Sequence, residues 1–214
     1  MFSSFLNAFH AGGFIMYTLA ALSLVGLAIA FERIKCLRSE RLVSSNLMER
    51  SKNLWEAAQF EELAKLAEGR NCVMSRVLSS IIKHRSKPFD RVSMIASNTA
   101  SSAMKRELQR IYPLNIIATL SPLIGLFGTV AGMITSFRMI VITGVSGDAT
   151  IVADGISQAL VTTAAGLIVG IPTLAFYHYF KNRLSRFSSV IEDNSNTVLY
   201  DWLLDTPINE SDKH

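Results

Sequence analysis

Two long uncharged stretches, separated by one short polar segment, constrain this chain most. Residues 111–137 and 155–180 contain no Asp, Glu, Lys or Arg. Each is longer than the roughly 20 residues that an α-helix needs to cross about 30 Å of hydrocarbon. A third apolar block lies earlier, at residues 14–31, and half of the 214 residues are apolar. The pattern predicts an all-α integral membrane protein with three transmembrane helices.

The distribution of basic residues predicts how these helices are oriented. Residues 32–110 carry 16 Lys and Arg against 9 Asp and Glu, so by the positive-inside rule they form a cytoplasmic helical region. The loop at 138–154 contains one Arg and two Asp and is therefore outside. Basic residues follow the third span, which places the C-terminal helix and tail at 181–214 inside. Residues 1–31 then form a periplasmic N-terminus and the first span, with the N-terminus outside and the C-terminus inside.

The first apolar block has a rival interpretation as a cleaved signal peptide. Residues 1–13 contain no Lys or Arg, and no small-residue cleavage site follows the block. Basic residues follow it directly instead: Arg33, Lys35, Arg38 and Arg41. This arrangement favours an uncleaved signal anchor.

The polar parts of the chain read as helices. Asn53 and Glu56 resemble a capping box that opens a helix over residues 55–67. A second helix is predicted over residues 72–85, and a third begins near Phe89 and runs into the second span. After the third span a stripe at helical spacing is expected to pack on these helices or on a neighbouring subunit: Leu184, Phe187, Ile191, Asn194 and Val198.

The hairpin at residues 111–180 carries small and polar residues at helical spacing. One face of the second span steps by three and four residues through Pro122, Gly125, Thr129, Gly132 and Ser136. The third span does the same through Ala159, Thr163, Gly166 and Gly170. Gly128 with Gly132, and Gly166 with Gly170, are GxxxG pairs that allow close helix approach, and Pro172 can bend the third span.

Two interpretations of these faces stay open. The threonines bond to their own i−4 carbonyls while the helices pack closely, or the polar face lines a pathway or cradles another helix. The depth of two threonines in the membrane favours the second interpretation. Thr129 and Thr163 each lie eight residues from the outer end of their span, about 12 Å below the outer surface. Gln158 lies one turn below the start of the third span. Its amide is either solvated there or lines the same polar layer from another angle.

Catalytic, metal and nucleic-acid sites are not predicted. No nucleophile–base pair, phosphate loop or metal cluster has credible spacing, so the chain is not expected to be an enzyme or to hold a cofactor or metal. The net charge of +4 is modest and lies mostly outside the apolar blocks. The basic residues are therefore interpreted as topology determinants rather than as a nucleic-acid surface.

At the hairpin the sequence resembles the MotA/TolQ/ExbB proton-channel family. The resemblance rests on LSPLIGLFGTVAG at 120–132 and on GISQALVTTAAG at 155–166, followed by Ile171 and Pro172. Three spans are similar to ExbB and TolQ rather than to the four-span MotA. The resemblance implies a homopentamer in the bacterial inner membrane, around a dimer of a single-span partner like ExbD or TolR that carries a membrane Asp. A TonB- or TolA-like protein is a further partner that it implies.

The same resemblance implies a function. The chain would be the channel-forming subunit of a proton-motive-force-driven energy transducer that powers envelope transport or maintenance. Thr129 and Thr163 match the family threonines that face the pore, whereas Gln158 stands where ExbB and TolQ usually carry a Glu. That departure removes the only carboxylate the family places in the hairpin. The alternative is therefore a non-conducting membrane scaffold of a multi-protein envelope complex.

Overall fold

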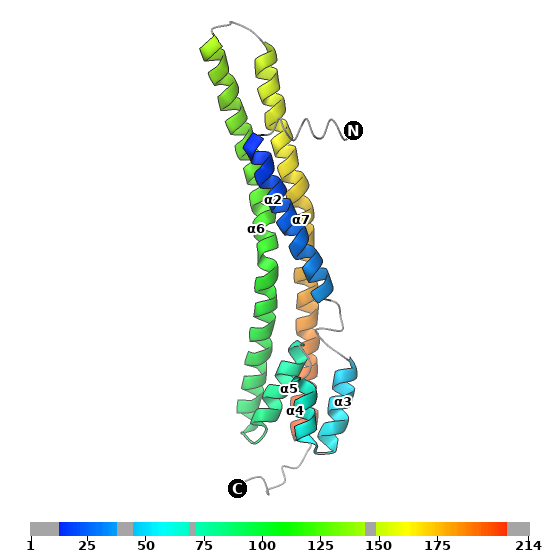
Figure 1. Cartoon of the computed structure of the whole chain (residues 1–214). Helices are drawn as coiled ribbons and strands as arrows, with labels where there is room; N and C mark the ends of the chain where they lie inside the picture. Colours follow the sequence, from blue (N-terminus) through cyan, green and yellow to red (C-terminus); the bar gives the residue numbers. More distant parts are fainter. Residues whose placement is uncertain (1–12, 38–44, 69–71, 144–148, 205–214) are drawn as a thin grey trace. The chain divides into compact units, whose positions relative to one another are not determined.

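Every element of the described chain is helical, as the sequence predicts. The computed structural model describes residues 13–37, 45–68, 72–143 and 149–204. Its elements are α2 (Gly13–Cys36), α3 (Ser45–Glu56), α4 (Phe60–Glu68), α5 (Val73–His84), α6 (Phe89–Thr143), α7 (Ala149–Thr197) and the π-helical η2 (Val198–Leu204), shown in Figure 1. Three stretches within these ranges are long and apolar enough to cross a membrane: Gly13–Lys35, Phe89–Met139 and Gly155–Leu203.

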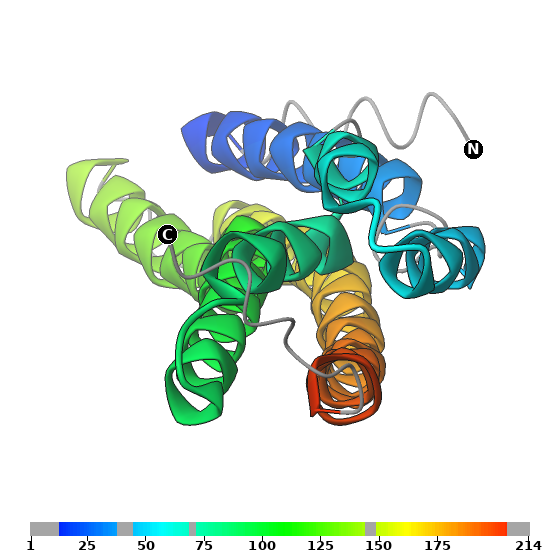
Figure 2. The ribbon, with the colours of Figure 1, turned by 90° about the horizontal axis from the view of Figure 1, so that it is seen from below.

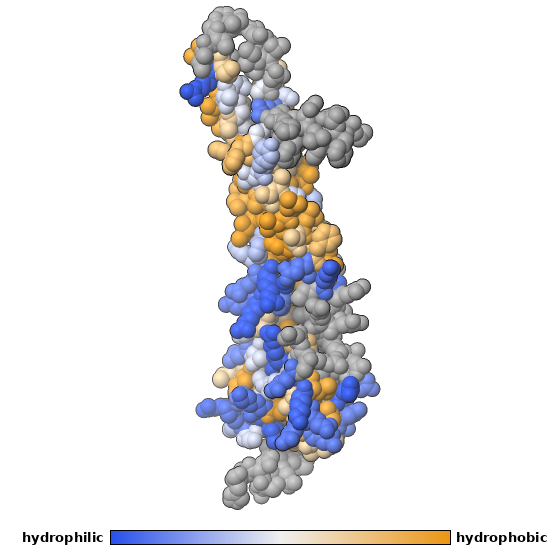
Figure 3. Space-filling view, viewed as in Figure 1, coloured by the Kyte–Doolittle hydropathy of each residue, from blue (hydrophilic) through white to orange (hydrophobic). Residues whose placement is uncertain are grey.

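The chain divides into two compact units. The apolar unit comprises residues 1–32 and 111–179, and the polar unit comprises residues 33–110 and 180–214. Figure 3 shows apolar side chains gathered over the first and hydrophilic side chains over much of the second. The helices α6 and α7 contribute to both units.

In the apolar unit, α6 and α7 pack so closely that side chains are excluded from parts of their interface. A β-carbon on Gly125 would lie 2.8 Å from the main-chain oxygen of Thr162, and one on Gly166 would lie 2.5 Å from that of Ser121. Real β-carbons do not approach so near, so glycine is required at both positions. The resulting contact is the close backbone approach that small residues allow between membrane helices.

The first helix covers one flank of this α6–α7 pair. A β-carbon placed on Gly26 of α2 would lie within 4 Å of Thr173 of α7 and of Ile117 of α6. A β-carbon on Gly26 would make only ordinary van der Waals contacts there, so α2 lies against both helices without requiring glycine at this position. We call the side of α6 and α7 that α2 covers the covered flank, and the opposite side the open flank.

Both long helices extend beyond the predicted spans. Helix α6 runs to Thr143 and α7 begins at Ala149, so much of the segment predicted as a loop at 138–154 is helical. The remaining residues 144–148 lie outside the described chain, as do residues 1–12 and the tail from 205. Helix α7 is continuous through Pro172.

The polar unit is built from short helices around the ends of α6 and α7. Helices α4 and α5 pack against each other, and α3 contacts α4 and η2 (Figures 1 and 2). The apolar stripe predicted after the third span has its Leu184, Ile191 and Val198 buried within the chain. A desolvated ion pair joins the last turn of α2 to α6, with Arg33 Nη1 3.3 Å from Glu107 Oε2.

One predicted helix boundary is wrong. The capping-box pattern predicted a single helix over residues 55–67, but α3 continues through Asn53 to Glu56 and the chain turns at Ala58, whose φ is 55°. Trp55 explains the break. Its indole Nε1 donates to the main-chain oxygen of Trp202 at 3.0 Å, and its ring lies edge-on to Phe60 with centroids 5.3 Å apart. The chain therefore turns around a buried tryptophan that is anchored from the far end of the sequence.

Candidate functional site

Three threonine hydroxyls converge on two neighbouring carbonyls of α6. Thr129 Oγ1 donates to the oxygen of Leu126 at 2.7 Å, and Thr163 Oγ1 of α7 donates to that of Gly125 at 3.2 Å. Thr162 Oγ1 donates to Ala159 at 2.7 Å and reaches the Gly125 oxygen at 3.4 Å. Because Gly125 and Leu126 are consecutive, the three hydroxyls form one layer in the apolar unit. We call these three residues the threonine layer.

The threonine layer offers acceptors rather than donors. A hydroxyl has one donor and two lone pairs, and each donor here is used in a bond to a carbonyl. The lone pairs of Thr129 and Thr163, both half-buried, stay accessible to water or to a protonated group from another chain. Thr162 is 1% exposed, so its hydroxyl serves the helix contact instead.

Thr162 is the member of the layer that the sequence interpretation missed. The spacing of three and four residues was assigned to Ala159, Thr163 and Gly166, but it fits Ala159, Thr162 and Gly166 equally well. The structure buries the second set between the helices and leaves Thr163 at the edge of the contact. The sequence held no signal that separates the two threonines, because Thr162 lies seven and eight residues from Gly155 and Gly170, and Thr163 lies eight and seven.

Gln158 is not brought together with the two threonines. Its Nε2 atom lies 4.0 Å from the position of a β-carbon on Gly13, the first residue of α2. It is five residues from Thr163 along α7, which turns it about 140° away on the helix. Gln158 therefore lies on the covered flank, where α2 begins, and Thr163 lies toward the open flank.

The residues predicted to pack or to face a partner mostly line the α6–α7 interface: Pro122, Gly125, Gly128, Gly132, Ser136, Ala159, Gly166 and Gly170. The ring of Pro122 fills the space beside Gly170, where a β-carbon would lie 2.9 Å from it. Pro172 is the exception, because its side chain is exposed within the chain.

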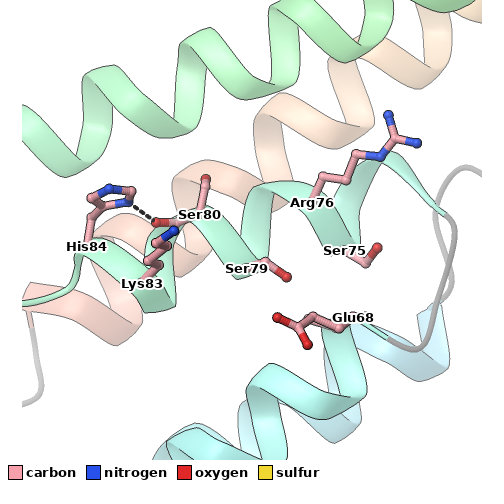
Figure 4. A pocket seen from close by; sticks show the side chains of 8 residues that line it. Glu68, Ser75, Arg76, Ser79, Ser80, Lys83 and His84 are labelled. Carbon is pink, nitrogen blue, oxygen red and sulfur yellow. Dashed lines mark hydrogen bonds between the residues drawn. The ribbon is translucent and has the colours of Figure 1, made fainter.

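The polar unit offers a groove of about 400 Å³ between α4 and α5 (Figure 4). His84 directs Nδ1 to the main-chain oxygen of Ser80 at 2.9 Å, while Glu68 and Arg76 point in different directions. These groups form no nucleophile–base pair. Within the described ranges no three His, Cys, Asp or Glu residues are grouped so that they could hold a metal ion. The threonine layer is therefore the better candidate site.

Comparison with known proteins matches a segment that includes this hairpin. Residues 69–193 match the sequence profile of the MotA/TolQ/ExbB proton channel family. A biopolymer transport protein ExbB homologue of Methanothermobacter thermautotrophicus is 30% identical over 185 residues, 86% of this chain and 65% of that protein. An ExbB-like protein of Synechocystis is 36% identical over 180 residues, 80% of this chain and 68% of that protein.

A Tol-Pal relative is matched over more of its own length. The Tol-Pal system protein TolQ of Pseudomonas aeruginosa is 29% identical over 198 residues, 86% of this chain and 84% of its own length. By contrast, the chain spans less than two thirds of the Methanothermobacter relative. The similarity to TolQ therefore extends over most of both proteins.

Proposed function

The chain belongs to the MotA/TolQ/ExbB proton channel family, and from that premise we propose that it is the channel-forming subunit of a proton-motive-force-driven energy transducer of the ExbB/TolQ type. It is a multi-pass membrane protein, and we place it in the bacterial inner membrane. The work it would power is envelope transport or maintenance.

The observation that carries this proposal is the threonine layer. Thr129 and Thr163 present free lone pairs toward the open flank, inside two stretches that have no charged residue. A charged group at bilayer depth is expensive unless a polar niche receives it. Two accessible hydroxyl acceptors at one depth are suited to receive a protonated carboxyl or a water that hydrates its carboxylate.

The group that carries the proton at the depth of the threonine layer must come from another chain. A threonine hydroxyl orients water but stores no proton at neutral pH, and neither hairpin stretch contains a carboxylate or Lys. We therefore propose a single-span partner of the ExbD/TolR kind whose membrane Asp alternates between charged and neutral forms. A homopentamer of this chain would surround it, with a TonB- or TolA-like protein as the component that is driven.

The proposed orientation follows the basic residues. Residues 1–31 would be a periplasmic N-terminus and first span, 32–110 a cytoplasmic helical region, 111–180 the channel hairpin, and 181–214 a cytoplasmic helix and tail. The charge balance of 32–110, with 16 Lys and Arg against 9 Asp and Glu, supports this by the positive-inside rule.

Proton flux in proteoliposomes tests the proposal. The chain alone should show only background leak, and co-reconstitution with a single-span protein that has one membrane Asp should raise the flux. The double variant Thr129→Val and Thr163→Val, similar in shape but without hydroxyls, should abolish the increase. Thr135→Val is the matched control, because that exposed hydroxyl also donates within α6, to Ala131 at 2.9 Å.

Two results would contradict the proposal. A pH gradient dissipated by the chain alone, well above empty liposomes, would mean that a conducting group lies within the chain. Full flux in the double variant would remove the role of the threonine layer. Native mass measurement in mild detergent checks that each variant still assembles, and a stable monomer of the unaltered chain would exclude the ring.

A non-conducting scaffold is the second candidate function. Gln158 favours it, since an amide occupies the position at which a carboxylate is expected and lies beside Gly13 of α2 rather than in the threonine layer. A scaffold would bind the partner with no increase in flux, and the threonine variants would then leave every readout unchanged.

A further inference from the structure

Polar side chains continue along the open flank beyond the threonine layer. On α6, Thr119 and Asn115 lie ten and fourteen residues before Thr129, which places them about 80° and 40° from it around the helix. Thr119 is exposed and Asn115 half-buried. The Thr119 hydroxyl donates to the main-chain oxygen of Asn115 at 2.8 Å, so its lone pairs point outward, as those of Thr129 do.

The packing of the two helices brings His178 of α7 to the same end of this flank. Gly125 lies against Thr163 and Gly166, and Gly170 lies against Ala118 and Pro122, so each step along α6 corresponds to one step back along α7. Continuing this register inside the apolar unit places His178 level with residues 111 and 112, about 6 Å along the axis from Asn115. His178 is exposed, and its fifteen-residue separation from Thr163 turns it only about 60° around the helix.

The other hydroxyls near the interface are not available in this way. Ser121 is fully buried and donates to Ile117 at 2.7 Å. Thr173 is 7% exposed, donates to Val169 at 2.7 Å, and faces Gly26 of α2. The open flank is therefore where accessible polar side chains of both helices gather between the threonine layer and the far end of the span.

We propose that Asn115, Thr119 and His178 form the release end of the proton path, with His178 as the group that passes the proton to the cytoplasm. This inference rests on the proposed function. The neutral hydroxyl and amide would hold water between the partner and the imidazole, and His178 would be the last protein group that the proton meets.

The chemistry needs only one bond to form and one to break. The unprotonated ring nitrogen of His178 accepts a proton from a hydrated proton or from the partner's carboxylic acid and becomes an imidazolium. It then gives a ring N–H proton to cytoplasmic water and returns to the neutral form. Histidine is the side chain that changes charge between pH 5 and 8, which suits repeated transfer to the cytoplasm.

The titratable groups around His178 permit that release. Tyr177 lies beside it with ring centroids 5.4 Å apart, Tyr112 lies at the same level of α6, and Lys181 follows three residues later. None of these is an acid that would hold an imidazolium in a salt bridge. Glu32, the acidic residue near this level on α2, belongs to the helix that covers the other flank.

The test uses the complex of the full chain with the single-span partner in proteoliposomes. His178→Gln should lower the partner-dependent proton flux by about tenfold or more, and should flatten its dependence on the pH of the cytoplasmic side between 5.5 and 7.5. Imidazole added on that side should restore part of the flux. Tyr179→Phe, a change at an exposed neighbour, should leave flux and pH profile as they are.

A second pair of variants keeps the inference testable if His178→Gln fails to assemble. Thr119→Val should reduce the flux, and Thr135→Val, whose hydroxyl makes an equivalent i−4 bond on α6, should not. Wild-type flux and pH profile in an assembled His178→Gln complex would overturn the inference and leave the proposed function standing. Absence of flux in the unaltered complex would overturn the proposed function itself.

Discussion

Gly166 and Gly132 both belong to GxxxG pairs, yet they differ in whether the structure has room for a larger side chain. A β-carbon on Gly166 would meet the Ser121 oxygen at 2.5 Å, whereas one on Gly132 would meet the Ala159 β-carbon at 3.4 Å, an ordinary contact. We expect Gly166→Ala to push the helices apart and cost about 1–3 kcal/mol, as overpacking does. Gly132→Ala should change stability by less than about 0.5 kcal/mol. Thermal unfolding midpoints in one detergent compare them, and an equal loss in both would contradict the packing argument.

The sequence predicted that small residues line the hairpin but could not rank them. Spacing fixes a helical face only to within one residue, so it placed Thr163, predicted to line the pathway, on one face with Ala159 and Gly166, where the structure buries Thr162 instead. The neighbours of Gln158 were also beyond prediction. They depend on where α2 begins relative to α7, and a contact between Gly13 and a residue far along the chain leaves no local pattern.

The attachment of α2 to α6 depends on a charge pair with little exposure. The Arg33 and Glu107 side chains are 5% and 15% exposed, and Arg110, which is 57% exposed, also reaches Glu107 at 2.9 Å. Arg33→Gln should therefore cost about 3 kcal/mol, because it leaves a desolvated carboxylate with less compensation. Arg110→Gln should cost less than about 1 kcal/mol, as solvent-screened pairs do. Denaturation of both variants measures this, and comparable losses would show that the desolvation of the first pair is unimportant.

Helices were predictable where apolar composition decides them and unpredictable where distant contacts decide them. The three candidate spans and the start of α6 at Phe89 follow from uninterrupted runs and a preceding proline. The break between α3 and α4 does not, because it depends on Trp55 bonding to Trp202, 147 residues away. The extension of α6 to Thr143 was missed for another reason: a helix need not end where a charge appears.

The function proposed for the complete chain depends on how its two flanks are used. Helix α2 covers one flank of the α6–α7 pair through Gly26, and Thr129 and Thr163 lie toward the other. An assembly in which the open flanks of several copies face a common partner would place the threonine layer around that partner. Because α2 occupies the covered flank, the open flank of each subunit is favoured for the proton path, and the covered flank is left for contacts with other subunits or with lipid.

The proposed orientation of the chain predicts which introduced cysteines can be labelled from outside the cell. In a background of Cys36→Ser and Cys72→Ser, single cysteines introduced as Ser4→Cys and Gly147→Cys should react with an impermeant thiol reagent applied to intact cells. Both positions lie outside the described residues. Ser4 precedes the first span and Gly147 lies between the second and the third, in segments with few basic residues. Lys181→Cys, at an exposed position directly after the third uncharged stretch, should react only after the membrane is opened. The physical reason is the strong bias of Lys and Arg toward cytoplasmic segments, because residues 32–110, proposed to be cytoplasmic, hold 16 of the 21 basic residues. Labelling of Lys181→Cys in intact cells, with Ser4→Cys protected, would reverse the topology. It would also move the release end assigned to His178 to the opposite face of the membrane, so this experiment fixes the direction of any flux measured in liposomes.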